Sequence, residues 1–371
     1  MPRYKIAVLP GDGVGNDVLD AALIVLEKLK VDAGYVHGEI GWKFWCAEGN
    51  ALPERTIKML KETDACLFGA ITSKPKEDAA AELAPSLQGK GLSYFSPIVR
   101  LRQEFDLYTN LRPCKAYPGN PLNYRDNIDL VIFRENTEGM YAGVEFFPLP
   151  QSVRDALLVH SKMKPFQDVP LNEIALSTRI MTKKGCERIV QAAFDYARKN
   201  KRRSVTIVEK PNVLRETGGL MLGVARAIAK QYPDVEFKEA NVDAMCMWLI
   251  KNPHDYDVLV AENLFGDIIS DLAAQLVGGL GFAAAGNIGD KYAVFEPTHG
   301  SAPKYAGQFK VNPIATFLAA KLMLEWLGEK DKARTLEGAV AEVIQEAKVR
   351  TYDMGGKSTT LDMAQAVAAR L

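Results

Sequence analysis

The sequence predicts an α/β protein built on a central sheet that helices cover. Short runs rich in Val, Ile and Leu, bounded by turn residues, alternate along the 371-residue chain with segments of helical periodicity. This alternation is typical of sheets whose strands are covered on both faces. The length suggests two domains, or one large α/β domain with an excursion.

The first predicted strand is residues 5–10, and a helix follows at 17–30. A helix at 54–63 leads into a strand at 65–70. Further strands are predicted at 128–136, 204–210 and 257–263, each near a helical segment. Residues from about 143 to 175 are less regular and contain several prolines, so we expect an arm or subdomain there. A long surface loop is the alternative.

Composition and charge argue against several classes of protein. The 46 basic and 46 acidic residues give a formal net charge of +0, whereas nucleic-acid and membrane-surface proteins usually carry a basic excess. The five cysteines are dispersed and form no CxxC pair, which favours buried thiols in a reducing compartment. The chain enters a strand directly, and no apolar run approaches the roughly 18 residues of a membrane span. We therefore expect a cytoplasmic protein.

The stretch LPGDGVGNDV, residues 9–18, looks like a dinucleotide-binding fingerprint. However, Gly11, Gly13 and Gly15 are spaced G-x-G-x-G, whereas the Rossmann pattern is G-x-G-x-x-G. No clear acidic strand end follows at about 20 residues. We interpret the stretch as a tight strand-to-helix turn, and we do not expect a conventional Rossmann fold.

The stretch NLFGDIISDLAAQ, residues 263–275, combines a helical pattern with two acids. Asp267 and Asp271 lie four residues apart, so both carboxylates share one helix face and repel each other by a few tenths of a kcal/mol. Together with Asp243, they suit Mg²⁺ or Mn²⁺, which prefer oxygen ligands. A solvated helix face is the alternative, but the spacing of the apolar residues predicts a mostly buried helix. The apolar residues with this helical spacing are Leu264, Ile268, Ile269 and Leu272.

Three arginines complement the acids. Arg102 and Arg112 lie in VRLRQEFDLYTNLRPCK, and Arg134 ends the strand predicted at 128–136. Guanidinium groups bind carboxylates in bidentate fashion. A metal site combined with several arginines implies a small polyanionic substrate.

The chain resembles the isocitrate and 3-isopropylmalate dehydrogenase family of metal-dependent β-decarboxylating dehydrogenases. The motifs LRQEFDLYTNLRP, FRENTEGMYAG, NLFGDIISDLAAQLVGGLG and EPTHGSAPKYAGQFKVNP match in order, and the similarity runs from LPGDGVG to RTYDMGGKSTT. The resemblance implies a large cofactor-binding domain, residues 1–105 and 276–371. It also implies a small dimerisation and substrate domain, residues 106–275, with an arm at about 143–175. It further implies a homodimer with shared active sites.

The implied reaction is the oxidative decarboxylation of a 3-carboxylated 2-hydroxy acid with reduction of NAD(P). The resemblance assigns the substrate carboxylates to Arg102, Arg112 and Arg134, and the metal to Asp243 of the opposite subunit, Asp267 and Asp271. Lys210 matches the lysine that assists hydroxyl deprotonation, Tyr141 the tyrosine that protonates the enolate, and Asn212 a substrate or nicotinamide contact. The chain departs from the family at Pro211, where Ala or Gly is usual.

The resemblance places the adenosine of the cofactor on loops of the C-terminal segment. Lys304 and Tyr305 stand where many NAD-dependent members have an acidic and an aliphatic residue, which favours NADP. The arginine expected four residues after Tyr352 is Gly356, beside Lys357, so NAD remains an alternative. The predicted cofactor-binding residues are Thr72, His299, Gly300, Lys304, Tyr305, Val311, Asn312 and Tyr352.

The residues before Arg102 face the substituent on C3 in this family. Ser96 matches the serine that contacts the extra carboxylate in isocitrate enzymes, whereas Ile98 and Val99 resemble the apolar lining for an isopropyl group. We favour isocitrate, with 3-isopropylmalate as the alternative, followed by homoisocitrate and D-malate or tartrate. A catalytically inactive regulatory subunit is the non-enzyme alternative, and the retained acids and arginines argue against it.

Overall fold

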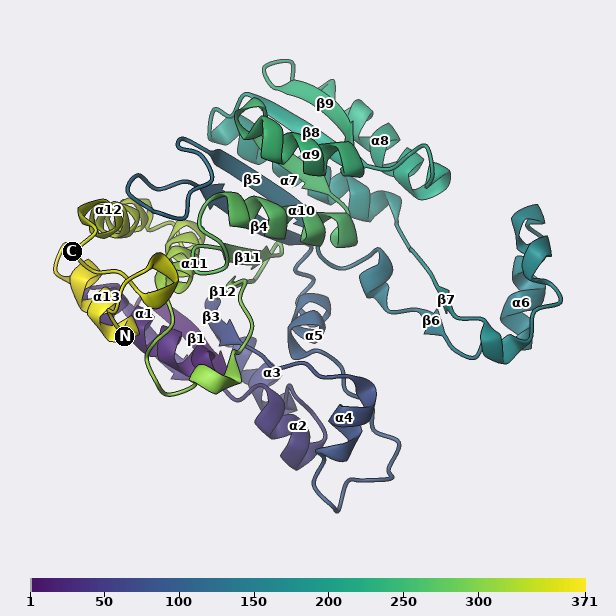
Figure 1. Ribbon diagram of the computed structural model, residues 1–371, viewed down its shortest axis with the longest axis horizontal. Coiled ribbons are helices and arrows are strands. Elements are labelled where there is room, and N and C mark those ends of the chain that lie inside the picture. The colour runs from purple at the N-terminus through teal and green to yellow at the C-terminus, as the bar shows by residue number, and fades with distance from the viewer. Residues whose placement is uncertain (1) are drawn as a thin grey trace.

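A computed structural model describes residues 2–371 (Figure 1). A ten-stranded sheet runs through the molecule in the order β2-β1-β3-β12-β11-β4-β5-β10-β8-β9. Its strands are β1 (Tyr4–Gly11), β2 (Ala33–His37), β3 (Ala65–Ala70), β4 (Thr109–Lys115), β5 (Asp129–Glu135), β8 (Ser204–Glu209), β9 (Glu236–Asn241), β10 (Val258–Ala261), β11 (Ala284–Ile288) and β12 (Ala293–Pro297). Strands β6 (Glu145–Phe146) and β7 (Leu176–Ser177) form a separate antiparallel pair.

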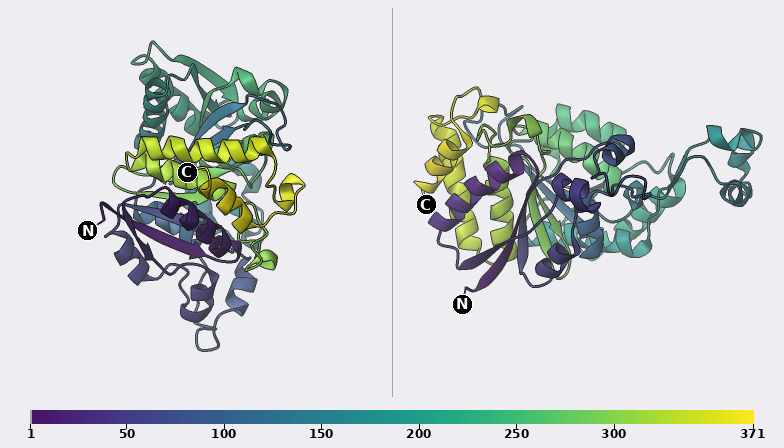
Figure 2. Two further views of the ribbon diagram at one scale, coloured as in Figure 1. Left: turned by 90° about the vertical axis from the view of Figure 1, so that its left-hand side faces the viewer. Right: turned by 90° about the horizontal axis from the view of Figure 1, so that it is seen from below.

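The helices lie on both faces of the sheet (Figures 1 and 2). They are α1 (Val14–Lys28), α2 (Trp42–Glu48), α3 (Glu54–Leu60), α4 (Lys76–Ala81), α5 (Pro97–Glu104), α6 (Gln151–Leu157), α7 (Lys183–Lys199), α8 (Arg215–Ala229), α9 (Val242–Lys251), α10 (Asn263–Leu276), α11 (Ile314–Trp326), α12 (Lys330–Glu346) and α13 (Thr360–Ala368). None of the helices in residues 2–371 is long and apolar enough to cross a bilayer.

The predicted α/β class is confirmed, and all five predicted strands are present as β1, β3, β5, β8 and β10. Both ends of the sheet are parallel, but the middle is not, because β4 and β11 run antiparallel to their neighbours. The sequence pattern did not predict the other five strands of this sheet, β2, β4, β9, β11 and β12.

Each strand sends alternate side chains to opposite faces, and the apolar cores follow this alternation. On β5, Val131 and Phe133 join one large core beneath α1, α7, α8 and α11–α13, whereas Leu130 and Ile132 join a smaller cluster beneath α9 and α10. On β12, Val294 joins a third cluster, beneath α3 and α5. One face of the sheet therefore carries a continuous core, and the other carries two separate clusters, the α9–α10 cluster and the α3–α5 cluster.

The turn after β1 is the tight strand-to-helix turn predicted from its glycine spacing. Gly11 and Gly13 have φ of +73° and +56°, and a Cβ at Gly11 would lie 1.9 Å from the carbonyl oxygen of Ala70. Asp12 accepts the backbone N–H groups of Trp42 and Thr72, both at 2.8 Å. The turn thus fastens β1 to the segments that follow β2 and β3.

Residues 143–175 extend away from the body of the molecule (Figures 1 and 2). This segment carries β6 and α6, and it returns to the body through β7. It exposes large apolar side chains, with Phe147 71%, Val159 90% and Phe166 50% exposed. The division of the chain into two domains stays a prediction.

Helix α10 packs closely on β5 at Gly266. A Cβ on Gly266 would lie 2.6 Å from Arg134 Cγ and 3.1 Å from Arg134 Cα, so only glycine allows this approach. We expect Gly266→Ala to lower the free energy of unfolding by about 1–3 kcal/mol, because the helix must move away from the strand. Urea denaturation measures the change.

A matched control is Gly338→Ala, within α12, where a new Cβ meets no heavy atom within 4 Å. This variant should gain about 0.5–1 kcal/mol through helix propensity. Equal effects of the two substitutions would contradict the close approach at Gly266.

Candidate active site

A polar site fills the space between the α3–α5 cluster and the α9–α10 cluster. Arg134 follows Ile132 by two residues on β5, and Arg112 precedes Cys114 by two on β4, so both face the side of these clusters. Asn287 of β11 pairs in register with Asn110 of β4, and Asn110 pairs with Arg134. Three neighbouring strands therefore present polar side chains in one row.

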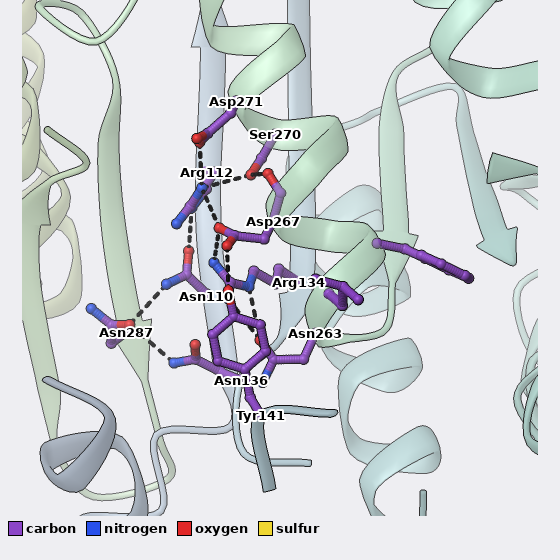
Figure 3. A network of polar contacts seen from close by, with 12 residues as sticks. Asn110, Arg112, Arg134, Asn136, Tyr141, Asn263, Asp267, Ser270, Asp271 and Asn287 are labelled. Atoms are coloured by element: carbon purple, nitrogen blue, oxygen red, sulfur yellow. Dashed lines mark hydrogen bonds and ion pairs between the residues drawn. The ribbon is translucent and has the colours of Figure 1, made fainter. Parts of the chain in front are cut away.

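The arginines contact the acids of α10 (Figure 3). Arg134 Nη1 donates to Asp267 Oδ1, and Arg112 Nη1 lies 3.0 Å from Asp271 Oδ1 and 3.4 Å from Asp267 Oδ1. Arg112 also donates to Ser270 Oγ at 2.7 Å. Two of the three predicted arginines and two of the three predicted aspartates thus meet at one place, where Asp267 and Asp271 lie beside two guanidinium groups.

Burial decides the electrostatics of this contact. Arg134 is 1% exposed, and burial together with the positive charges of Arg102 and Arg112 lowers its pKa to about 10. Burial alone would raise the pKa of Asp267, but Arg134 and the hydroxyl group of Tyr141 lower it below its ordinary value. Asp267 is therefore ionised at neutral pH and neutralises part of the buried positive charge.

Tyr141 lies on a 3-10 turn, Met140–Ala142, and points at the same acid. Its hydroxyl group donates to Asp267 Oδ2 at 2.6 Å, and the guanidinium carbon of Arg134 lies 4.9 Å from the centre of its ring. Burial, followed by the Asp267 hydrogen bond, raises the pKa of Tyr141. The phenol is therefore protonated at neutral pH and is available as a proton donor.

Arg102, on α5, is held by residues that the sequence reasoning missed. Its Nε donates to Asn287 Oδ1 at 2.9 Å, and its Nη2 lies 3.4 Å from Glu296 Oε1. Asn110, Asn136 and Asn263 were missed as well, although they bond to Asn287 or to Arg134. The available signal was an asparagine or glutamate inside an otherwise apolar run, as in AAAGNIG and AVFEP.

Lys210 and Asp243 lie together but apart from this cluster. Lys210 Nζ donates to Asp243 Oδ1, and this ammonium group lowers the pKa of the Asp243 carboxyl. No hydrogen bond or ion pair within residues 2–371 joins either residue to Tyr141, Asp267 or Asp271. Asn212 is exposed in the loop between β8 and α8.

The acids fit a hard divalent cation only in part. Asp267 and Asp271 contact the same nitrogen atom of Arg112, so their oxygens are near enough to share one ion. No group of three His, Cys, Asp or Glu residues is arranged to hold a metal among residues 2–371. Two carboxylates from one chain leave an octahedral ion short of protein ligands, and any further carboxylate has to come from elsewhere.

Five of the predicted cofactor residues line one cavity of about 500 Å³, namely His299, Gly300, Val311, Asn312 and Tyr352. Burial lowers the pKa of His299, and its Nε2 has no hydrogen-bond partner among residues 2–371. An unpaired buried imidazole nitrogen beside a cavity fits a polar ring such as an adenine. Thr72 lies beside this loop, with its Oγ1 2.6 Å from Ser301 Oγ.

Lys304 and Tyr305 extend this region. The ring of Tyr305 lies 5.8 Å from that of Tyr352, and Lys304 Nζ lies 4.8 Å from the centre of the Tyr305 ring. Lys310 Nζ, which the sequence reasoning missed, lies 5.2 Å from the Tyr305 ring and 5.4 Å from the Tyr352 ring. Neither lysine has a carboxylate partner among residues 2–371, so the cluster can accept an anion.

The residues that precede Arg102 differ in where they point. Ser96 is half-buried immediately before α5, and its side chain makes no capping bond to the helix. Ile98 packs against the α3–α5 cluster. Ile98 and Val99 are both half-buried, so part of each side chain stays accessible for the predicted apolar lining.

A larger cavity, of about 710 Å³, opens on the opposite face of the sheet. Leu111, Pro113 and Lys115 of β4 line it, and these alternate with Arg112 along the strand. It contains none of the predicted site residues, and its charged groups pair with one another, as in Lys115–Glu337 and Arg202–Asp257.

Three comparisons with known proteins agree on one family. A family model described as Isocitrate/isopropylmalate dehydrogenase matches residues 5–367. The chain is 43% identical to Protein DlpA of Legionella pneumophila over 98% of this chain, but it spans only 58% of that protein's length. It is 41% identical to a 3-isopropylmalate dehydrogenase of Methanothermobacter thermautotrophicus, over 100% and 99% of the two chains. The crystal structure of isocitrate dehydrogenase from Methylococcus capsulatus matches with a TM-score of 0.85 and 39% identity, over 99% of each chain.

The two acids of α10 should differ in their effect on stability. The Asp267 side chain is 31% exposed and pairs with a buried guanidinium group, whereas the Asp271 side chain is 60% exposed. Asp267→Asn should lower the free energy of unfolding by about 3 kcal/mol, because it leaves Arg134 buried without its anion. Asp271→Asn should cost at most about 1 kcal/mol. Urea denaturation without added metal compares them, and equal losses would contradict this asymmetry.

Proposed function

The chain belongs to the isocitrate/isopropylmalate dehydrogenase family of decarboxylating hydroxy-acid dehydrogenases, and we propose that it oxidises isocitrate to 2-oxoglutarate and CO₂ with NADP. The observation that carries the proposal is the meeting of Arg112, Arg134, Tyr141 and the two acids of α10 in one polar site. Ser96, half-buried immediately before α5, also supports isocitrate over 3-isopropylmalate, because it resembles the serine that contacts the extra carboxylate in isocitrate enzymes.

Arg102, Arg112 and Arg134 would bind the substrate carboxylates. All three are less than 9% exposed, so their charges are poorly screened and bind a polycarboxylate strongly. Each also keeps one fixed neutral partner, Asn287, Asn110 and Asn263 respectively, which holds the guanidinium plane in place. Orientation of this kind selects a substrate by the spacing of its carboxylates.

Tyr141 and Lys210 are the two residues that would transfer protons. Tyr141 would donate the proton to C3 after CO₂ leaves, because its phenol is held protonated beside Asp267. Lys210 would accept the proton of the C2 hydroxyl group. When bound by Asp267, Asp271 and Asp243, a Mg²⁺ or Mn²⁺ ion would polarise the C2 oxygen.

The separation of Lys210 and Asp243 from the arginine cluster supports a homodimer with shared active sites. In this arrangement each subunit supplies Asp243 to the site of its partner. The exposed apolar side chains of α9 and α10 support the same assembly, since Met247 is 62%, Ile250 45% and Ile268 51% exposed on helices that pack together. The expectation that Ile268 is buried is wrong for the single chain, and a dimer would bury it.

The preference for NADP rests on the uncompensated lysines beside Tyr305 and Tyr352. Lys304 and Lys310 would contact a 2′-phosphate, which an acidic residue at position 304 would repel. The presence of the acids, the arginines, Lys210 and Tyr141 within this one chain argues against the regulatory-subunit alternative.

An activity panel tests the reaction. Isocitrate, 3-isopropylmalate, homoisocitrate, D-malate and tartrate are compared with NAD and NADP in the presence of Mg²⁺ or Mn²⁺. We expect the highest kcat/KM for isocitrate with NADP, and loss of turnover in EDTA that added Mn²⁺ restores. A higher kcat/KM for another acid would identify that acid, and not isocitrate, as the substrate. Full turnover after chelation would refute the metal assignment.

The cofactor preference is tested by Lys304→Asp combined with Tyr305→Ile. A charge-assisted contact is worth about 1.5–3 kcal/mol, so the ratio of NADP to NAD efficiency should fall about 10- to 150-fold. Calorimetry with adenosine 2′,5′-bisphosphate and AMP should show the same loss without turnover, and the loss should shrink in high salt. Lys291→Asp, an exposed residue of the β11–β12 turn, makes the same charge change and should leave the ratio intact.

A further inference from the structure

One buried side chain, Asn287, connects three separate segments of the active site. Its Oδ1 accepts hydrogen bonds from Arg102 Nε at 2.9 Å, Asn110 Nδ2 at 2.8 Å and Asn136 Nδ2 at 3.0 Å. Arg102 comes from α5, Asn110 from β4, and Asn136 follows β5. We propose that Asn287 is a positioning residue that fixes both Arg102 and Arg112 for the substrate carboxylates, an inference that rests on the proposed function for those arginines.

Asn287 is connected to Arg112 through Asn110, which forms a hydrogen bond with each of them. Asn110 gives its amide N–H to Asn287 and accepts Arg112 Nε on its own Oδ1 at 2.8 Å. One carboxamide therefore fixes the direction of the next, because an amide whose nitrogen is engaged must turn its oxygen the other way. Arg112 in turn donates hydrogen bonds to Ser270 and Asp271 on α10, so the chain of hydrogen bonds runs from β11 to α10 (Figure 3).

Only a carboxamide meets both demands at position 287. Its oxygen accepts the three N–H donors, and its nitrogen donates to Glu296 Oε1 at 2.7 Å and to the carbonyl oxygen of Val294 at 3.3 Å. A carboxylate accepts equally well but presents a second oxygen to Glu296 and to Val294. Leucine has the same shape but leaves all these groups unpaired. Asn287 and Asn110 are 0% exposed, so water cannot replace either contact.

The position of Glu296 explains why the amide matters for substrate binding. Glu296 contacts Arg102 and Asn287 together, so the three groups form a closed triangle on the floor of the site. Glu296 compensates the charge of Arg102, whereas Asn287 fixes the direction of its Nε without adding charge. Arg102 thereby keeps its remaining donors and its positive charge for a ligand carboxylate.

The test is Asn287→Asp, which keeps the shape and the acceptor and removes only the donor. The groups that face the new carboxyl are Arg102 on α5, Glu296 on β12 and the amides of Asn110 and Asn136, with Arg112 one contact further on β4. Burial and the neighbouring Glu296 raise the pKa of the new carboxyl, and Arg102 opposes them. Below that pKa the protonated acid can donate to Glu296 as the amide does, and above it the two carboxylates repel each other.

We therefore expect KM for the substrate to stay near the wild-type value at pH 6 and to rise about 10- to 100-fold by pH 9 relative to wild type, with a smaller change in kcat. The affinity for adenosine 2′,5′-bisphosphate, measured by calorimetry, should change less than about twofold, because neither Asn287 nor Arg102 lines the proposed cofactor cavity. A residue with a merely structural role would lower stability and both affinities at every pH.

The double variant Asn287→Asp with Glu296→Gln exchanges the amide and the carboxylate between the two positions. It keeps the net charge and the hydrogen bond between the two side chains, so it should fold and restore a KM close to wild type without the new pH dependence. Asn200→Asp, at the exposed end of α7, makes the same chemical change away from the site and serves as the control.

An Asn287→Asp variant with an unchanged KM, or a double variant as impaired as the single one, would overturn the positioning role. If Asn287→Asp does not fold, the double variant decides the question in the same way. These outcomes are distinct from failure of the proposed function. In that case the wild-type protein itself would turn over none of the 3-substituted malates of the activity panel.

Discussion

The burial of three guanidinium groups on one face of the sheet is the constraint on which the rest of the site depends. Arg102, Arg112 and Arg134 are 6%, 8% and 1% exposed, and buried charges are costly unless they are paired and hydrogen-bonded. Asp267 and Glu296 supply the negative charge, while Asn110, Asn263 and Asn287 supply neutral acceptors. The neutral acceptors satisfy N–H groups without cancelling the field that an anionic substrate requires.

This constraint explains which parts of the fold the sequence could predict. Strands β1, β3, β5, β8 and β10 were found because their side chains are apolar on both faces, which gives continuous hydrophobic runs. Strands β4 and β11 carry Arg112, Asn110 and Asn287 on one face, and β4 also contains Pro113, so their hydrophobic pattern is interrupted. Local rules fail here because the polar residues serve the site.

The candidate site shows the same division. The arginines and aspartates were predictable, because charged residues within motifs are visible in a single sequence. The hydrogen bonds that Asn287 Oδ1 accepts were not, since each joins residues more than 150 positions apart and depends on the order of β11, β4 and β5. Ile268 marks another limit. A helical pattern of apolar residues predicts that one helix face is covered. It does not predict whether the covering surface belongs to the same chain or to a partner.

The charges at the two ends of the site are arranged in different ways. Beside Tyr305 and Tyr352, in the proposed cofactor region, Lys304 and Lys310 are exposed and have no carboxylate partner among residues 2–371, so an anion can bind there without displacing an existing partner. Beside α10, in the proposed substrate region, Asp267 and Asp271 already occupy nitrogen atoms of Arg112 and Arg134. Under the proposed function, substrate binding must therefore exchange these internal contacts for external ones, and the released carboxylates then require another positive partner. The placement of both acids on the helix face beside the arginines serves both states. They neutralise buried charge in the free chain, and under the proposed function they would become available as hard oxygen ligands when the substrate takes over the arginines.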